Sequence, residues 1–84
     1  METNTIAELI KSGLNNAQVE VKDTTGGGDH FSAIVVSDDF QGLSLVDQHQ
    51  LVYKSLGKYL TKEIHALQLK TLTMSEWNKN NSEE

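Results

Sequence analysis

Apolar residues at helical spacing open the chain. They form a stripe of Ile6, Leu9, Ile10 and Leu14. This spacing places the apolar side chains on one face and is typical of an amphipathic helix. Thr3 or Asn4 can cap the first turn, and Asn15-Asn16 ends the pattern. We therefore predict a first helix between these polar residues.

Three later segments have the pattern of β-strands. Residues 18–24 and residues 65–72 alternate between apolar and polar positions, whereas residues 31–37 are a short run rich in β-branched and apolar residues. Three consecutive glycines at 26–28 resist regular structure, so residues 24–29 are predicted to be a loop. These segments predict three strands, the first two of them joined by a glycine-rich loop.

Two further helices are predicted. Ser44 can cap a second helix that runs to about Leu60, residues 75–77 open a short last helix, and residues 78–84 form a polar tail. The inner stripe of the second helix is predicted to contain Leu45, His49, Val52, Leu56 and Leu60. The predicted core comprises Ile6, Leu9, Ile10, Ile34, Val36, Val52, Leu56, Leu67 and Leu69.

This order of elements predicts an α+β fold with helices on one face of a three-stranded mixed sheet. The short loop favours antiparallel pairing of the first two strands, and the long helical connection favours parallel pairing of the last two. The second and third strands would then begin at the same end of the sheet. His30 and His65 stand at these starts, about 4.8 Å apart in strand spacing, so both rings could reach one ligand.

The histidines also have plainer interpretations. A histidine at the start of a strand is commonly a surface or capping residue, which is the alternative for His30 and His65. His49 lies on the apolar stripe of the second helix, so we interpret it as a packed core histidine.

Composition limits the chemistry of the chain. Its 84 residues make one small domain, and the absence of cysteine excludes a disulfide, a thiol nucleophile and an iron–sulfur cluster held by its own thiolates. The net charge is −5, and all seven basic residues are lysines. This excess of acidic residues disfavours nucleic-acid binding. The only clustered basic residues that could contact a nucleic acid are Lys54, Lys58 and Lys62. No apolar run is long enough to span a membrane.

The chain resembles the BolA family from about residue 5 to residue 79. The matching segments, in order, are residues 27–31, 35–37, 40–42, 49–53, 64–66, 70–73 and 76–77, with the sequences GGDHF, VVS, FQG, HQLVY, IHA, KTLT and EW. The resemblance implies an α-β-β-α-α-β-α fold similar to the type II KH fold, with a small extra helix near Asp38–Gln41. We therefore expect a single BolA-like domain over 1–79, and the polar composition of the last residues predicts a disordered tail over 80–84.

The resemblance also implies a function. BolA-like proteins pair with monothiol glutaredoxins and share a [2Fe–2S] cluster, whose ligands include a glutaredoxin cysteine, glutathione and histidine. The invariant histidine of the family matches His65, and the loop ligand, which is His or Cys in the family, matches His30. The expected role is a non-enzymatic one in iron–sulfur cluster trafficking or in iron and redox regulation. The expected location is the cytoplasm, or the stroma or matrix of an organelle derived from bacteria.

The family also includes DNA-binding transcriptional regulators linked to stress, which is the alternative function. Many relatives carry Arg-His-Arg in the middle of the long helix. This chain has Gln48-His49-Gln50 there, and it has no arginine at all. The alternative would therefore rest on Lys54, Lys58 and Lys62, which recur every fourth residue along the predicted helix.

Overall fold

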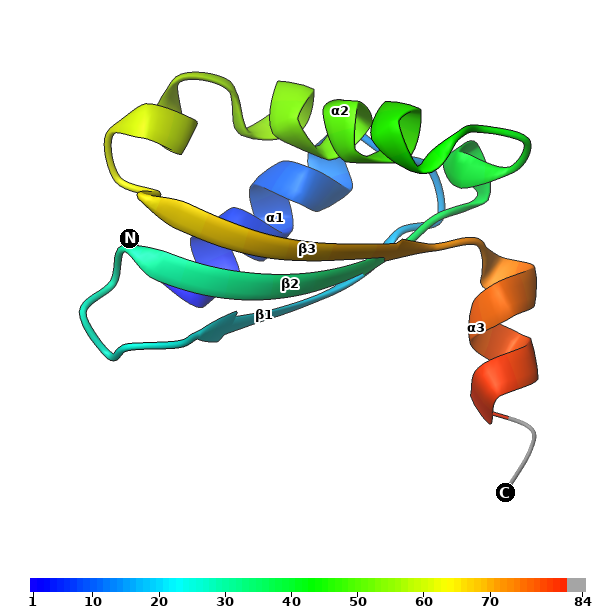
Figure 1. Cartoon of the computed structure of the whole chain (residues 1–84), viewed down its shortest axis with the longest axis horizontal. Helices are drawn as coiled ribbons and strands as arrows, with labels where there is room; N and C mark the ends of the chain where they lie inside the picture. Colours follow the sequence, from blue (N-terminus) through cyan, green and yellow to red (C-terminus); the bar gives the residue numbers. More distant parts are fainter. Residues whose placement is uncertain (82–84) are drawn as a thin grey trace.

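The computed structural model describes residues 1–81 and has the expected α+β architecture (Figure 1). Its elements are α1 (Thr3–Ser12), β1 (Gln18–Asp23), β2 (His30–Val36), the 3₁₀ helix η1 (Asp38–Phe40), α2 (Leu45–Leu56), the 3₁₀ helix η2 (Gly57–Thr61), β3 (Ala66–Leu72) and α3 (Met74–Asn81). The strand order is β1-β2-β3, with β1 antiparallel and β3 parallel to β2. The predicted mixed sheet, its order and the small helix near Asp38 are confirmed.

The core lies between the sheet and two helices. Helices α1 and α2 cover the same face of the sheet, as Figure 1 shows. The buried cluster contains Ile6, Ile10, Leu14, Phe31, Ala33, Val35, Phe40, Val52, Leu56 and Ile64. The predicted core residues Leu9, Leu67 and Leu69 are half-buried and pack against this cluster. The prediction of a core under two amphipathic helices is therefore confirmed.

The residues of β2 that point toward the helices differ from those predicted. Phe31, Ala33 and Val35 face the helices and are buried, although none was in the predicted core. Ile34 is only half-buried, because it alternates onto the other face of the sheet. His30 and Ser32 are the polar positions on this outer face, but every residue from Ala33 to Val36 is apolar, so the alternation is lost over the second half of the strand.

The second helix is shorter than predicted. Helix α2 ends at Leu56, because Gly57 takes a positive φ of 52° and the chain continues as the 3₁₀ helix η2. Leu45 is 61% exposed, so its placement on the inner stripe was wrong. Gln48 is buried instead, and its side-chain oxygen accepts a 2.6 Å hydrogen bond from the Thr71 hydroxyl.

Helix α3 lies at the end of the sheet where β3 finishes (Figure 1). Its start is held by a reciprocal pair: the Thr73 backbone N–H donates to the Glu76 carboxylate, and the Glu76 N–H donates to the Thr73 hydroxyl. Trp77 lines a cavity of about 220 Å³ with Ile34 and Val36, so it covers the end of the sheet face that α1 and α2 leave open. The helix continues through Asn81, so residues 78–81 are not the predicted tail, and residues 82–84 lie outside the described residues.

None of the helices within residues 1–81 combines the length and the apolar character needed to cross a membrane.

Candidate functional site

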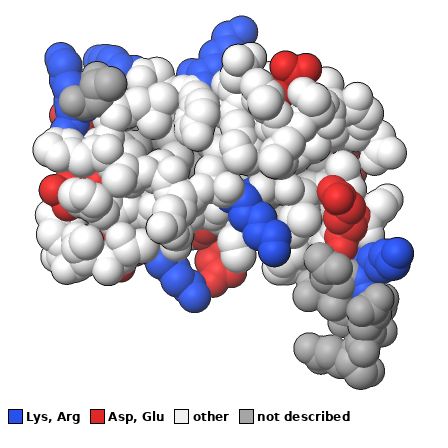
Figure 2. All heavy atoms as spheres, viewed as in Figure 1, with Lys and Arg blue, Asp and Glu red and all other residues white. Residues whose placement is uncertain are grey.

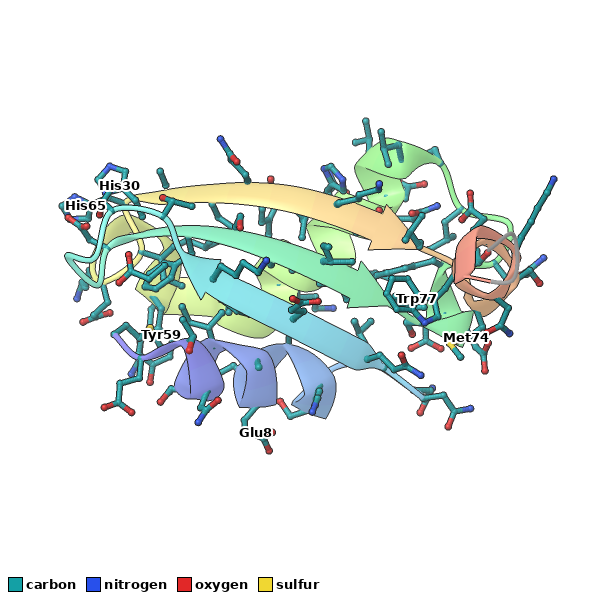
Figure 3. All side chains as sticks on the ribbon, turned by 90° about the horizontal axis from the view of Figure 1, so that it is seen from below. Glu8, His30, Tyr59, His65, Met74 and Trp77 are labelled. Atoms are coloured by element: carbon teal, nitrogen blue, oxygen red, sulfur yellow. The ribbon has the colours of Figure 1, made fainter. Side chains whose placement is uncertain are left out.

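Two histidines meet at one end of the sheet. His30 is the first residue of β2, and His65 directly precedes β3, because the parallel register pairs His30 with Ala66. The two ring centroids are 6.2 Å apart, with the ring planes at 60°. Figure 3 shows both side chains at the same end of the sheet, beside the loop that joins β1 to β2. The predicted convergence of the histidines is therefore confirmed, and it follows from the parallel pairing of β2 and β3.

Asp29 contacts both histidines and was not singled out in the sequence. Its Oδ1 lies 2.9 Å from Nδ1 of His30, and its Oδ2 lies 3.9 Å from Nδ1 of His65. Its main-chain carbonyl accepts hydrogen bonds from the backbone N–H groups of His65, at 2.8 Å, and Ala66, at 3.3 Å. The position of Asp29 beside His30 in the glycine-rich loop was the sequence signal that could have identified it.

The histidines also affect the pKa of the Asp29 carboxyl. The hydrogen bond from His30 holds the pKa of the Asp29 carboxyl below its ordinary value, partial burial opposes this, and the charges of His30 and His65 lower the pKa further. Asp29 is thus a carboxylate at neutral pH, and a carboxylate only accepts hydrogen bonds.

A second carboxylate orders the loop that leads to His30. The Asp23 side chain accepts hydrogen bonds from the backbone N–H groups of Thr25, Gly26 and Gly28. Gly26 and Gly28 have φ values of 81° and 77°, a conformation that other residues seldom adopt. The bonds to Gly26 and the other loop amides lower the pKa of Asp23. The glycines therefore allow a turn that brings the loop amides onto one carboxylate.

The pair is accessible to a ligand outside the chain. The side chains of His30 and His65 are 44% and 58% exposed. Within residues 1–81, no group of three or more His, Cys, Asp or Glu side chains is arranged to hold a metal ion. Imidazole nitrogens are iron ligands in [2Fe–2S] centres in which histidines replace two of the four cysteines. Two exposed imidazoles therefore fit part of the ligand set of such a centre.

The third histidine has a different environment. His49 is half-buried on α2, with its ring centroid 6.3 Å from that of Tyr53. Its Nε2 is buried and has no hydrogen-bond partner in the structure. The prediction of a packed core histidine was therefore wrong in part, because one ring nitrogen is buried but the residue is half-buried and lies outside the core cluster.

The three clustered lysines do not share one helical face. Lys54 belongs to α2, Lys58 lies in η2, and Lys62 follows η2, so the break at Gly57 interrupts the predicted row. The Lys58 ammonium lies 5.8 Å from the centroid of the Tyr59 ring. Figure 2 shows basic and acidic side chains interspersed over the viewed face, with no single basic patch. The continuous lysine row was therefore a wrong prediction.

The fold and the histidine pair define a small α+β domain of a known kind. A solved structure of a bolA protein homologue from Coxiella burnetii superposes with a TM-score of 0.80 at 37% identity, covering 93% of this chain and 97% of that one. The acid stress protein IbaG of Escherichia coli K12 is 37% identical over 78 residues, or 92% of this chain and 89% of IbaG.

The DNA-binding transcriptional regulator BolA of Escherichia coli K12 is 32% identical over 79 residues, covering 86% of this chain and 75% of that protein. The family model for BolA-like proteins matches residues 5–76. The chain belongs to the BolA-like family.

Proposed function

We propose that this chain is a non-enzymatic partner of a monothiol glutaredoxin and that the two share a [2Fe–2S] cluster. His65 and His30 supply imidazole ligands, and the partner supplies a cysteine thiolate and bound glutathione. The observation that supports this proposal is the pair of exposed histidines, with ring centroids 6.2 Å apart, at one end of the sheet. Family membership supports the same role.

The donor set of the chain explains why the cluster would lie at an interface. Iron–sulfur clusters need several strong ligands, and the chain has no cysteine. Its two imidazoles can satisfy one part of the cluster while the thiolates of the partner satisfy the rest. The role of the complex would be iron–sulfur cluster trafficking or regulation by iron and redox state, in the cytoplasm or in a matrix or stroma of bacterial origin.

The test is to mix the chain with a cluster-loaded monothiol glutaredoxin and glutathione, and to record visible absorption and circular dichroism. We expect a spectrum that neither protein gives alone. His65→Ala should abolish it, because this variant removes the imidazole held at the start of the rigid strand β3. His30→Ala should weaken or alter the spectrum less, because another donor can replace a ligand next to the loop.

His49→Gln is the matched control, since it removes an imidazole outside the pair. This variant should keep the spectrum of the mixed complex. A wild-type spectrum from both His30→Ala and His65→Ala would contradict the proposal.

A second candidate function is nucleic-acid binding. It is favoured by the similarity to the Escherichia coli protein named a DNA-binding transcriptional regulator. The net charge of −5 and the interruption of the lysine row at Gly57 rank it below the cluster-binding role.

A further inference from the structure

Asp29 connects the two histidines through both its side chain and its main chain. One carboxylate oxygen lies 2.9 Å from Nδ1 of His30, and the other lies 3.9 Å from Nδ1 of His65. Its carbonyl oxygen accepts from the N–H groups of His65 and Ala66, which fixes the start of β3 against the end of the loop. A single residue therefore contacts both rings and joins the two chain segments that carry them.

The contact with His30 determines which ring nitrogen carries the proton. The Asp29 carboxylate can only accept a hydrogen bond, so Nδ1 of His30 must be the donor at 2.9 Å. In a neutral imidazole the other nitrogen, Nε2, then keeps its lone pair. Metal-binding histidines commonly donate their second ring N–H to a carboxylate, which fixes both the tautomer and the orientation of the ring.

The contact with His65 is weaker. A separation of 3.9 Å between Nδ1 and Oδ2 is too long for a hydrogen bond, so Asp29 acts on this ring through charge. The main-chain bonds of Asp29 are independent of its side chain and would persist in a side-chain variant. A substitution at Asp29 should therefore change His30 strongly and His65 slightly, while the start of β3 stays in place.

We propose that Asp29 is a positioning residue that holds His30 as the Nδ1–H tautomer and presents its Nε2 as the cluster ligand. The inference rests on the proposed cluster-binding function, and it assigns to this chain a carboxylate that supports an imidazole ligand. Asp29 itself does not bind iron in this arrangement, because its oxygens face the Nδ1 atoms of the rings.

The first test uses the chain without cluster. The ring ¹⁵N chemical shifts are measured at about pH 8, where an ordinary imidazole is neutral. Wild type should show His30 as the Nδ1–H tautomer. Asp29→Ala should move His30 toward the Nε2–H form, which an unconstrained imidazole favours in water. Asp29→Asn can accept from Nδ1 through its oxygen or donate to Nδ1 through its amide, so it should show less of the Nδ1–H tautomer than wild type.

The second test uses the mixed complex with glutaredoxin and glutathione. Removing the partner of a metal-binding histidine typically lowers metal affinity about 10- to 100-fold, and we expect Asp29→Ala to weaken cluster retention by this factor. Asp29→Asn should weaken cluster retention less than Asp29→Ala does. Glu8→Ala removes one carboxylate from the exposed face of α1, away from the histidines in Figure 3, and should behave as wild type.

The outcomes separate the two proposals. If wild type forms no shared cluster, the proposed function fails, and the ring ¹⁵N shifts still decide the role of Asp29. If wild type forms the cluster but Asp29→Ala retains both the His30 tautomer and the cluster, the inference about Asp29 is overturned alone. Far-ultraviolet circular dichroism of each variant confirms that the fold is intact.

Discussion

The two ends of the sheet differ in what their side chains do. At the end where β2 and β3 begin, His30 and His65 are about half exposed, and their contacts are polar. At the end where β2 finishes, Val36 is buried and lines a cavity together with Trp77. The 3₁₀ helix η1 follows and places Phe40 in the core. The first end presents nitrogen atoms to a ligand, and the second end supplies apolar burial. Substitutions at the two ends should therefore separate binding from stability.

The largest loss of stability should come from the apolar end. Phe40 is fully buried, so Phe40→Ala leaves a cavity and should lower the free energy of unfolding by about 3–5 kcal/mol. Urea denaturation followed by circular dichroism measures this change. A loss below about 1 kcal/mol would show that the packing around η1 contributes little.

The glycine-rich loop should show a pH-dependent contribution. Hydrogen bonds from the Gly26, Gly28 and Thr25 amides lower the pKa of Asp23 from its ordinary value of 3.8. A carboxyl whose pKa is lowered by folding stabilises the protein fully at pH values above its ordinary, unfolded-state pKa. This stabilisation is lost as the pH falls through the lower, folded-state pKa. Asp23→Ala should therefore be less stable than wild type at about pH 6, and the difference should shrink as the pH falls below the ordinary value of 3.8.

Urea titrations of both proteins across this pH range test the Asp23 prediction. Glu20→Ala on β1 is the control, since its exposed carboxylate pairs only with Lys22, at 3.8 Å in the described structure. A difference between Asp23→Ala and wild type that stayed constant with pH would contradict the role of the ionised carboxylate.

The histidines themselves should matter little for stability. His30→Ala and His65→Ala remove partly exposed rings, and we expect changes in the free energy of unfolding within about 0.5 kcal/mol. The same denaturation experiment measures both. A decrease in the free energy of unfolding above about 2 kcal/mol would indicate that the histidine has a structural role. The two ends of the sheet would then no longer differ in their contribution to stability.

The smallest expected effect is on DNA. Even if Lys54, Lys58 and Lys62 all contacted phosphates, the log–log salt slope would be only about −2.7, and we expect no specific binding at about 0.15 M salt. A fluorescence anisotropy titration tests this. A sub-micromolar, sequence-selective complex would place the nucleic-acid function first.

The sequence predicted the order of the elements well because each had a local signal. The apolar stripe of α1, the Ser44 cap and the three glycines are all short-range features. The meeting of His30 and His65 was also predictable, because a helical connection favours parallel strands that start at the same end. The loss of helical geometry at Gly57 was not predicted, since a glycine inside an amphipathic pattern can be tolerated or can end the helix.

Tertiary structure decided how completely each face of β2 is buried, and it alone decided which residue supports the histidines. His30 and Ser32 mark the outer face in the sequence, but Ile34 and Val36 on that face are apolar too, so the packing of α1 and α2 completes the selection of Phe31, Ala33 and Val35 for the core. Asp29 reaches His65 across 36 positions of the sequence, because β3 returns beside β2. Sequence periodicity reports the local environment of a residue, whereas contacts between distant segments depend on how the whole chain packs.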